Sequence, residues 1–187
     1  MMNKKRHAAD AEYYYHSLQS IWGEVIALYT YGPFVLHKIF LPAHPVSAQT
    51  RLSLNSCVKD RTPSMDAQAV FQIINAYIAG HPIETPWDRL DLSGMTSLEQ
   101  AVLKKTADIP YGNVASYGDV AVAIGRPKAF RFVGNTLAAN PFPILIPCHR
   151  VIRSDGSLGQ FGGGRELKKK MIALEKKHQN MYLRDLN

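Results

Sequence analysis

The second half of this 187-residue chain carries closely spaced signals for the starts and ends of short helices. Thr96-Ser97 can cap a helix, because a side-chain oxygen there can accept a backbone N–H, and Glu99-Gln100 supplies the matching third position. Ser116 and Asp119 repeat this pattern for a second helix. Gly125 can end that helix because glycine tolerates a positive φ. The chain after Thr96 is therefore predicted to be mostly helical.

A third helix is expected directly after Gly125. Pro127 is at a position typical of a first helical residue, where its fixed φ is helical and its missing N–H needs no partner. This helix is predicted to run to about Ala139, where Asn140-Pro141 ends it. Two helices joined by a tight turn in this way predict a helix-turn-helix.

The helix predicted after Pro127 has two distinct faces. Its inward stripe contains Ala129, Phe132, Val133 and Leu137. Its outward face contains Lys128, Arg131, Gly134, Asn135 and Ala138. This outward face is basic but built of small residues, and a helix about 10–12 Å across needs small residues to approach a minor groove only about 6 Å wide. The face therefore favours minor-groove docking, with an ordinary amphipathic surface helix as the alternative.

The first half of the chain is typical of a small sheet with one helix. Two apolar runs within residues 22–41 flank Tyr31-Gly32-Pro33 and predict a hairpin, and residues 51–58 are expected to add a third strand. Ser64 can cap a helix whose apolar positions recur at helical spacing until Gly80.

These patterns predict an α+β chain of two domains. Residues 81–94 are rich in Pro, Asp and Gly and are expected to connect the two. The N-terminal α/β domain, a sheet with a helix, is predicted over residues 1–92, and the mostly helical C-terminal domain over residues 93–187.

Charge and cysteine content narrow the classes of function. The net charge of +7 and the pI of about 9.4 suit a polyanionic partner such as nucleic acid. Residues 1–10 lead into no apolar segment, and no run approaches the roughly 20 apolar residues of a membrane span, so we expect a soluble intracellular protein. The two cysteines cannot form a disulfide framework, and Cys57 is expected to be a packing residue. No metal site is expected, because close ligand spacing is missing among His7, His16, His37, His44, His81 and Cys57.

Residues 144–152 form an apolar, extended stretch that is interrupted by Pro147-Cys148-His149-Arg150. A cysteine there is expected to be buried, which raises the pKa of a thiol, so a reactive Cys148 needs a partner that takes its proton. His149 is the nearest candidate. Because adjacent side chains of an extended chain point to opposite faces, we expect a bridging water between them. A carboxylate should then orient the imidazole.

The last predicted helix, over residues 165–177, can supply this carboxylate. Leu167, Met171 and Leu174 share one stripe, and Glu175 lies at its edge, where it could face inward. Glu166 points elsewhere. The lysines are expected to form a solvated face: Lys168, Lys169, Lys170, Lys176 and Lys177. An inert buried cysteine and a solvent-exposed Glu175 are the alternative.

The segment Pro147-Cys148-His149-Arg150-Val151 closely resembles the active-site segment of the O6-alkylguanine-DNA alkyltransferases, the methylated-DNA–protein-cysteine methyltransferases. It is preceded by Asn140-Pro141-Phe142-Pro143-Ile144 and followed by a Gly-rich turn. The similarity extends from about Thr96 to Lys177. Further motifs in family order and spacing are Ile109-Pro110-Tyr111-Gly112, Ser116-Tyr117-Gly118 and Arg131-Phe132-Val133-Gly134. The N-terminal half is similar only in outline, as the family's small sheet-plus-helix domain, which is ribonuclease H-like.

This resemblance implies roles for the residues of the reaction centre. Cys148 matches the alkyl acceptor, His149 the base that reaches it through water, and Glu175 the carboxylate that orients His149. Asn140 matches the hinge residue that joins the recognition helix to the active-site segment. Tyr117 matches the residue that crowds the 3′ phosphate and donates a proton toward guanine N3.

The resemblance also implies how DNA and the base are held. Arg131 matches the residue that enters the base stack in place of the extruded base. The helix face around it, which is expected to contact DNA, adds Lys128, Gly134, Asn135 and Ala138. Main-chain groups at Cys148 and Val151 match those that accept the guanine amino group, and a backbone N–H near Gly162 matches the donor to O6. Phe161 and Gly162 stand where some members carry Tyr and Ser, which puts the range of accepted alkyl groups in doubt.

The implied function is direct, stoichiometric and irreversible transfer of an alkyl group to Cys148. The donor would be O6-alkylguanine, and also O4-alkylthymine, in double-stranded DNA. Guanine O6 lies on the major-groove edge, so a protein in the minor groove must flip the base out of the stack to reach it. The resemblance further implies a monomer that needs no cofactor and acts in the cytoplasm, on the nucleoid in a prokaryote or in the nucleus in a eukaryote. It leaves zinc open, because some family members bind zinc in the N-terminal half and others do not.

Three other functions fit parts of the pattern. An alkyltransferase-like protein binds alkylated bases without repairing them, but such proteins replace the nucleophile, commonly with Trp, whereas Cys148 is intact. A helix-turn-helix regulator with a sensor cysteine would need to read sequence, and small Gly and Ala side chains give little basis for that. A cysteine hydrolase would need an oxyanion hole, which no motif here specifies.

Overall fold

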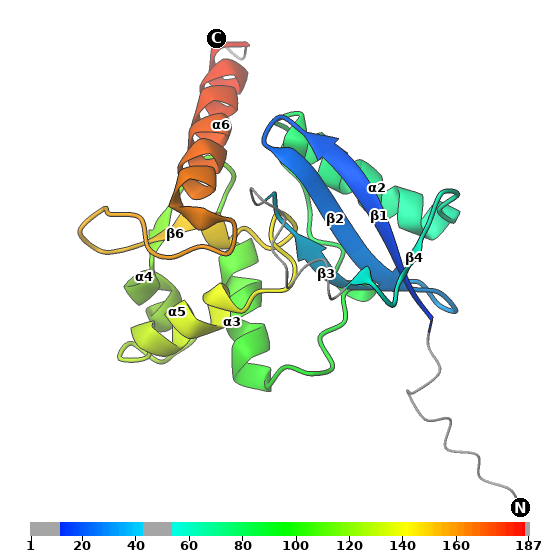
Figure 1. The fold of residues 1–187 in the computed structure, drawn as a ribbon. Helices are drawn as coiled ribbons and strands as arrows, with labels where there is room; N and C mark the ends of the chain where they lie inside the picture. The colour runs from blue at the N-terminus through cyan, green and yellow to red at the C-terminus, as the bar shows by residue number, and fades with distance from the viewer. Residues whose placement is uncertain (1–11, 43–53, 186–187) are drawn as a thin grey trace, which may run out of the picture.

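A computed structural model of the chain describes residues 12–42 and 54–185. Figure 1 shows a small sheet with helix α2 (Met65–Ile78) on one side of the molecule. A group of short helices and the long helix α6 (Gly164–Asp185) form the other side. This mixed arrangement confirms the predicted α+β class.

The sheet contains an antiparallel meander of three strands. They are β1 (Tyr13–Ser20), β2 (Gly23–Thr30) and β3 (Val35–Phe40), and the last two form the predicted hairpin. No strand is predicted before Trp22, so β1 is an addition. The side chains of β1 explain why the sequence does not predict this strand. Leu18 is its one buried residue, so the strand has no clear alternation of apolar and polar positions.

The third strand expected over residues 51–58 is largely wrong. Residues 51–53 lie outside the described residues, and Leu54 is helical. Asn55 and Ser56, which favour turns, form one here. Only β4 (Val58–Lys59) follows, and it pairs in parallel with β1 to give the sheet order β3-β2-β1-β4.

Helix α2 begins and ends as predicted. The Ser64 hydroxyl accepts the backbone N–H of Ala67, and Gly80 follows the helix with a φ of 93°. The buried side chains of α2 recur at helical spacing: Ala67, Val70, Phe71, Ile74 and Tyr77. This face packs into the core that the helix shares with the sheet.

The helical half follows its capping signals. Both predicted capping boxes are present, Thr96 with Glu99 at the start of α3 (Ser97–Ala107) and Ser116 with Asp119 at the start of α4 (Tyr117–Ala123). Gly125 follows α4 with a φ of 69°. A two-residue strand, β5 (Ala115–Ser116), precedes α4.

The predicted helix start at Pro127 is wrong. Helix α5 (Phe130–Ala138) begins three residues later. Pro127 lies instead in a turn that is closed by a hydrogen bond from Ala129 N to Arg126 O of 2.8 Å. Proline is common both at the second position of such a turn and at the first position of a helix, because its fixed φ suits both. Lys128 therefore lies in the turn and not on the helix.

The active-site segment is not extended as predicted. Ile144 has a φ of 78°, and a bond from Ile146 N to Phe142 O of 2.8 Å closes a turn around it. A 3₁₀ turn, η3 (Cys148–Arg150), follows, and only β6 (Val151–Ile152) is a strand, paired in parallel with β5. Another 3₁₀ turn, η2 (Trp87–Arg89), lies in the connection between the halves.

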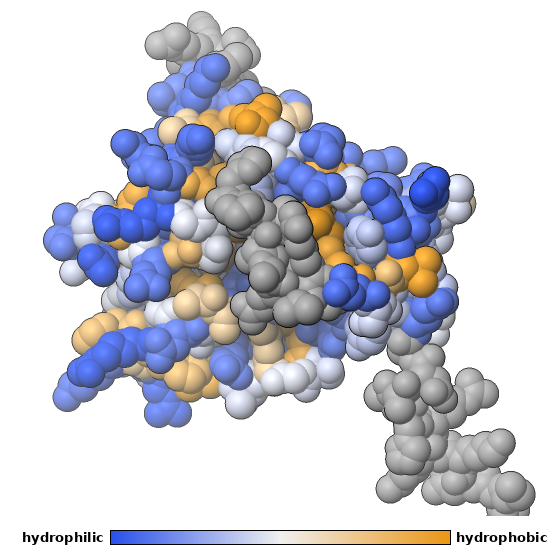
Figure 2. Space-filling model, in the orientation of Figure 1, coloured by the Kyte–Doolittle hydropathy of each residue, from blue (hydrophilic) through white to orange (hydrophobic). Residues whose placement is uncertain are grey.

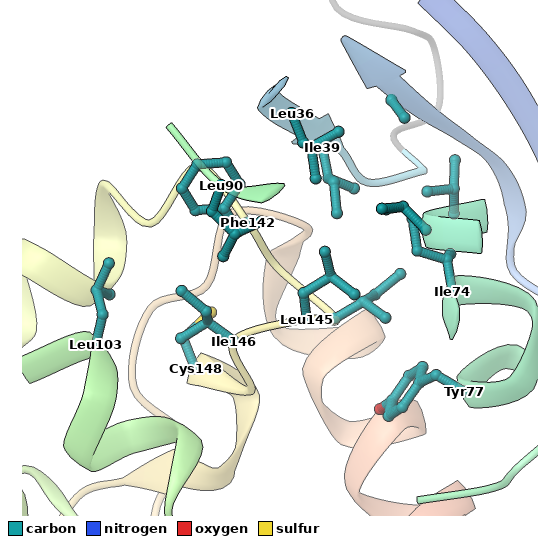
Figure 3. Close-up of a cluster of buried hydrophobic side chains, with 14 of the residues drawn as sticks. Leu36, Ile39, Ile74, Tyr77, Leu90, Leu103, Phe142, Leu145, Ile146 and Cys148 are labelled. Atoms are coloured by element: carbon teal, nitrogen blue, oxygen red, sulfur yellow. The ribbon is translucent and has the colours of Figure 1, made fainter. Parts of the chain in front are cut away.

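The segment before Cys148 joins the two sides of the molecule. Figure 3 shows Phe142, Leu145 and Ile146 in one buried cluster with Leu36 of β3 and Leu103 of α3. Two hydrogen bonds fix this joint, from Ile39 N to Pro141 O at 2.8 Å and from Thr85 Oγ1 to Leu145 O at 2.7 Å. The segment that carries Cys148 is therefore held by both halves.

Among the described residues, the structure contains no helix with the length and apolar character to cross a bilayer.

Candidate active site

Cys148 opens the η3 turn and is 5% exposed. Its Sγ accepts a hydrogen bond of 3.2 Å from Asn140 Nδ2. Burial raises the pKa of the Cys148 thiol, while the Asn140 N–H and the charge of Lys168 act in the opposite direction. Burial therefore disfavours the thiolate form of Cys148, and the contacts with Asn140 and Lys168 favour it.

Asn140 connects this thiol to the end of helix α5. Its Nδ2 also donates to Ile146 O at 3.1 Å, and its Oδ1 accepts from Phe142 N at 3.0 Å. The side chain therefore closes the loop from α5 to Cys148, which is the position expected of a hinge residue.

His149 and Glu175 form a buried pair. His149 Nε2 lies 2.6 Å from Glu175 Oε1. Burial, with the charges of Arg150 and Lys168, lowers the pKa of His149, although the carboxylate of Glu175 acts against this. The imidazole is thus neutral near pH 7. Its Nδ1 is buried and has no hydrogen-bond partner among the described residues.

Glu175 is held in its ionised form by several donors. Its Oε2 accepts from Arg150 Nε and from Gly112 N, both at 2.9 Å, and its Oε1 accepts from Tyr77 Oη at 3.1 Å. Burial alone would raise the pKa of Glu175, but its bonds and charge interactions with His149 and Arg150 outweigh burial and lower the pKa to about 2. These donors keep the Glu175 carboxylate ionised and hold it in one position as a hydrogen-bond acceptor.

The expectation that Lys168 belongs to a solvated face is wrong. Its side chain is 0% exposed, and its Nζ donates to Val151 O at 2.6 Å. Burial lowers its pKa to about 8. The spacing of Lys168, Met171 and Glu175 is helical, so the same periodicity that turns Glu175 inward also turns Lys168 inward.

Tyr117 and the first turns of α5 border a hollow of about 480 Å³. Its lining residues are Tyr117, Gly118, Phe130, Arg131, Gly134, Arg153, Ser154 and Asp155. Gly159 supports the Tyr117 ring, since a Cβ at Gly159 would lie 2.2 Å from Tyr117 Oη. Arg131 and Tyr117, which the family resemblance matches to DNA contacts, therefore line the same hollow.

Gly134 of the predicted DNA face also lines this hollow, and the other three residues of that face lie outside it. Lys128, Asn135 and Ala138 are exposed. In Figure 2, apolar and hydrophilic residues lie side by side on the part of the surface where Figure 1 places α4 and α5. Val122 and Phe130 are the large apolar side chains exposed there.

The residues expected around the base differ in burial and in contacts. Val151 is buried in β6, and its carbonyl is the one that Lys168 holds. The Phe161 ring meets the His149 ring edge-on, with centroids 6.4 Å apart. Gly162 is exposed in the glycine-rich turn before α6.

Comparison with known proteins identifies the family of this chain. The family described as "6-O-methylguanine DNA methyltransferase, DNA binding domain" matches residues 97–177. A methylated-DNA–protein-cysteine methyltransferase of Methanothermobacter thermautotrophicus is 36% identical over 116 residues, which are 62% of this chain and 65% of that protein. The protein of the same name from Mycobacterium tuberculosis is 45% identical over 114 residues, 61% of this chain and 67% of that protein. The aligned part thus spans about two thirds of these relatives.

A solved structure extends the likeness to the whole fold. The crystal structure of Mycobacterium tuberculosis OGT in complex with DNA superposes with a TM-score of 0.70 at 35% identity. The match covers 88% of this chain and 93% of that one. This chain belongs to the methylated-DNA–protein-cysteine methyltransferase family. Its structure carries the small sheet as well as the helical half.

In this member of the methyltransferase family, three buried residues of the site were missed by the sequence analysis. They are Tyr77, Arg150 and Lys168. Arg150 lies inside the recognised motif, but the pattern does not say that its guanidinium pairs with Glu175 and donates to Ile109 O at 2.6 Å. Tyr77 lies in the other half of the chain, and no local signal connects it to the site.

The methyltransferase site contains no cluster of metal ligands within the described ranges. Groups of three or more His, Cys, Asp or Glu side chains that could hold an ion do not occur there. His7 and His44 lie outside these ranges.

Proposed function

We propose that this protein repairs alkylated DNA by taking the alkyl group of O6-alkylguanine onto Cys148 Sγ. One observation carries the proposal: Cys148 Sγ accepts a hydrogen bond of 3.2 Å from Asn140, and the next residue, His149, pairs through Nε2 with the buried carboxylate of Glu175 and leaves Nδ1 without a partner among the described residues. Such a relay activates a nucleophile that burial would otherwise leave inert. The family names and the relative solved with DNA agree with this chemistry.

The reaction balances without a further reactant. His149 Nδ1 takes the Cys148 proton through a water molecule, and the thiolate forms a bond to the alkyl carbon as the bond between that carbon and O6 breaks. The electron pair stays on the guanine, and Tyr117, which keeps its phenolic proton because burial raises its pKa, donates toward N3. Arg131 fills the space that the flipped base leaves. The product thioether has no good leaving group, so each protein molecule acts once.

The DNA-binding part of the proposal rests on α4 and α5. We assign helix α4, the turn at Gly125 and helix α5 to a helix-turn-helix that docks in the minor groove. Arg131 and Tyr117 line the hollow beside it, and Lys128, Gly134, Asn135 and Ala138 complete the small basic face. Flipping brings O6 to a protein that approaches from the minor groove.

The remaining assignments follow from the same scheme. We assign the N-terminal half, residues 1–92, to a ribonuclease H-like domain, which the parallel pairing of β4 with β1 supports, and residues 93–187 to the alkyl-acceptor domain. O4-alkylthymine is a second substrate, and Val151, Phe161 and Gly162 bound the base pocket. The protein acts as a monomer on cytoplasmic or nuclear DNA, since one molecule carries every group that the reaction uses.

Mass spectrometry of the protein after incubation with a duplex that contains O6-methylguanine tests the proposal. We expect the intact mass to increase by one methyl group, and tryptic peptides to place that methyl on Cys148. Cys148→Ser is expected to bind the same duplex and to gain nothing. Binding without any mass increase in the wild type would show a damage-recognition protein, and specific binding to undamaged duplex would show a regulator.

A further inference from the structure

Tyr77 brings a side chain of the N-terminal half into the reaction centre. It lies on α2 and is 0% exposed. Its Oη is 3.0 Å from His149 Nε2 and 3.1 Å from Glu175 Oε1, and the Tyr77 and His149 ring centroids are 5.7 Å apart. These partners are 72 and 98 residues away in the chain. The hydroxyl thus touches both members of the buried pair.

The chemistry of the three groups allows one arrangement of protons. Glu175 is ionised and only accepts. The Tyr77 hydroxyl keeps its proton, because burial and the nearby carboxylate raise the pKa of Tyr77, and it donates that proton to Oε1. The phenol oxygen next to Nε2 can then only accept. Both neighbours of Nε2 are therefore acceptors, and a neutral imidazole can satisfy them only with its proton on Nε2.

We propose that Tyr77 is a positioning residue that holds His149 in the Nε2–H tautomer and so leaves Nδ1 as the base that serves Cys148. The inference rests on the proposed alkyl transfer for its consequence, but the tautomer exists in the free protein. It also gives the N-terminal half a part in the reaction, since α2 supplies a group that touches neither DNA nor the alkyl carbon.

Removal of the hydroxyl should change His149 in two ways. Glu175 Oε1 loses one donor and becomes a stronger acceptor for an imidazolium, so the pKa of His149 should rise. Nε2 loses one of its two acceptors, so the competing Nδ1–H tautomer becomes more populated. The charged groups that act on His149 in both proteins are Glu175 and Lys168 from α6 and Arg150 from η3.

The experiment compares Tyr77→Phe with Tyr29→Phe in the full-length protein. Tyr29 is a matched control, because it is equally buried and its hydroxyl donates to the carboxylate of Asp60 at 2.8 Å, away from the site. The first measurement is the ¹⁵N NMR spectrum of histidine-labelled protein, which reports which nitrogen of His149 carries the proton. The second is the rate of methyl transfer from an O6-methylguanine duplex as a function of pH.

In the wild type and in Tyr29→Phe we expect a protonated Nε2 and the same pH profile. In Tyr77→Phe we expect mixed tautomers, an acid limb moved to higher pH, and transfer about threefold to tenfold slower at pH 7, the range of one hydrogen bond. An unchanged tautomer, or an equal loss of rate at every pH in both variants, would reduce Tyr77 to a packing residue. If the wild type transfers no methyl group, the proposed function fails, and the NMR spectra still decide the tautomer.

Discussion

At the residue scale, one buried cation lies close to both reacting side chains of the proposed mechanism. Lys168 Nζ lies 5.8 Å from the centre of the Tyr117 ring, and its charge lowers the pKa of the Cys148 thiol against the effect of burial. Its bond to Val151 O fixes where this charge lies. The lysine therefore favours the thiolate before any substrate binds.

Replacement of this lysine by methionine tests that role. Lys168→Met keeps the length of the side chain but removes the charge, so the pKa of Cys148 should rise further. Methyl transfer at pH 7 should slow roughly tenfold, which corresponds to a shift of about one pKa unit from a nearby charge. The pH dependence of iodoacetamide labelling measures the thiol directly. Lys169→Met, at the exposed neighbouring lysine, should change neither quantity. An unshifted labelling profile in Lys168→Met would contradict the assigned charge effect.

At the element scale, the proposed mechanism requires α5 to bring one long side chain to the DNA while the rest of its face stays small. Arg131→Ala should slow repair of duplex DNA by roughly tenfold or more, because the unstacked base is no longer replaced and the cost of flipping is a few kcal/mol. Transfer from the free base O6-methylguanine should be unchanged, because no flipping is needed. Lys128→Ala, in the turn before α5, should weaken duplex binding and reduce its salt dependence, with no effect on transfer from the free base. Equal losses on duplex and free base would contradict the role given to Arg131.

The elements themselves show what local sequence could predict. Both capping boxes and the Ser64 cap were predictable, since a cap depends on residues three apart. Pro127 was misread because the same fixed φ suits a turn and a helix start. Strand β1 was missed because its pairing, and not an apolar face, defines it. Caps that need a specific pair of residues were therefore predictable, whereas a single proline was ambiguous and a strand defined by a distant partner was not.

At the scale of the whole molecule, the reaction centre depends on contacts between distant segments. The family resemblance placed Cys148, His149 and Glu175, but a neighbour such as Tyr77 comes from α2 and could be identified only once the halves were packed together. The helical stripe that includes Glu175 also includes Lys168, so its burial could have been inferred. The 3₁₀ turn at Cys148 could not, because the apolar residues before it are equally typical of an extended strand.

The buried pair should make the folded protein sensitive to acid. The pKa of His149 is lowered in the folded state, so below about pH 6.5 the unfolded chain binds a proton more readily than the folded chain. The free energy of unfolding therefore falls as pH decreases. Glu175, whose folded pKa is about 2 against 4.5, contributes further loss below about pH 4.5. Urea unfolding should therefore give a lower free energy at pH 5.5 than well above pH 6.5. His149→Asn should lose less over this interval, and an equal loss would point to other groups.

The central claim is that one Cys148 thiol is consumed for each lesion repaired. The most direct measurement is a titration of limiting protein with excess duplex containing radiolabelled O6-methylguanine, followed until label no longer moves. We predict a plateau of one methyl group per protein molecule, all of it bound to protein, and none with Cys148→Ala. Removal of several methyl groups per molecule, or their release into solution, would contradict the account.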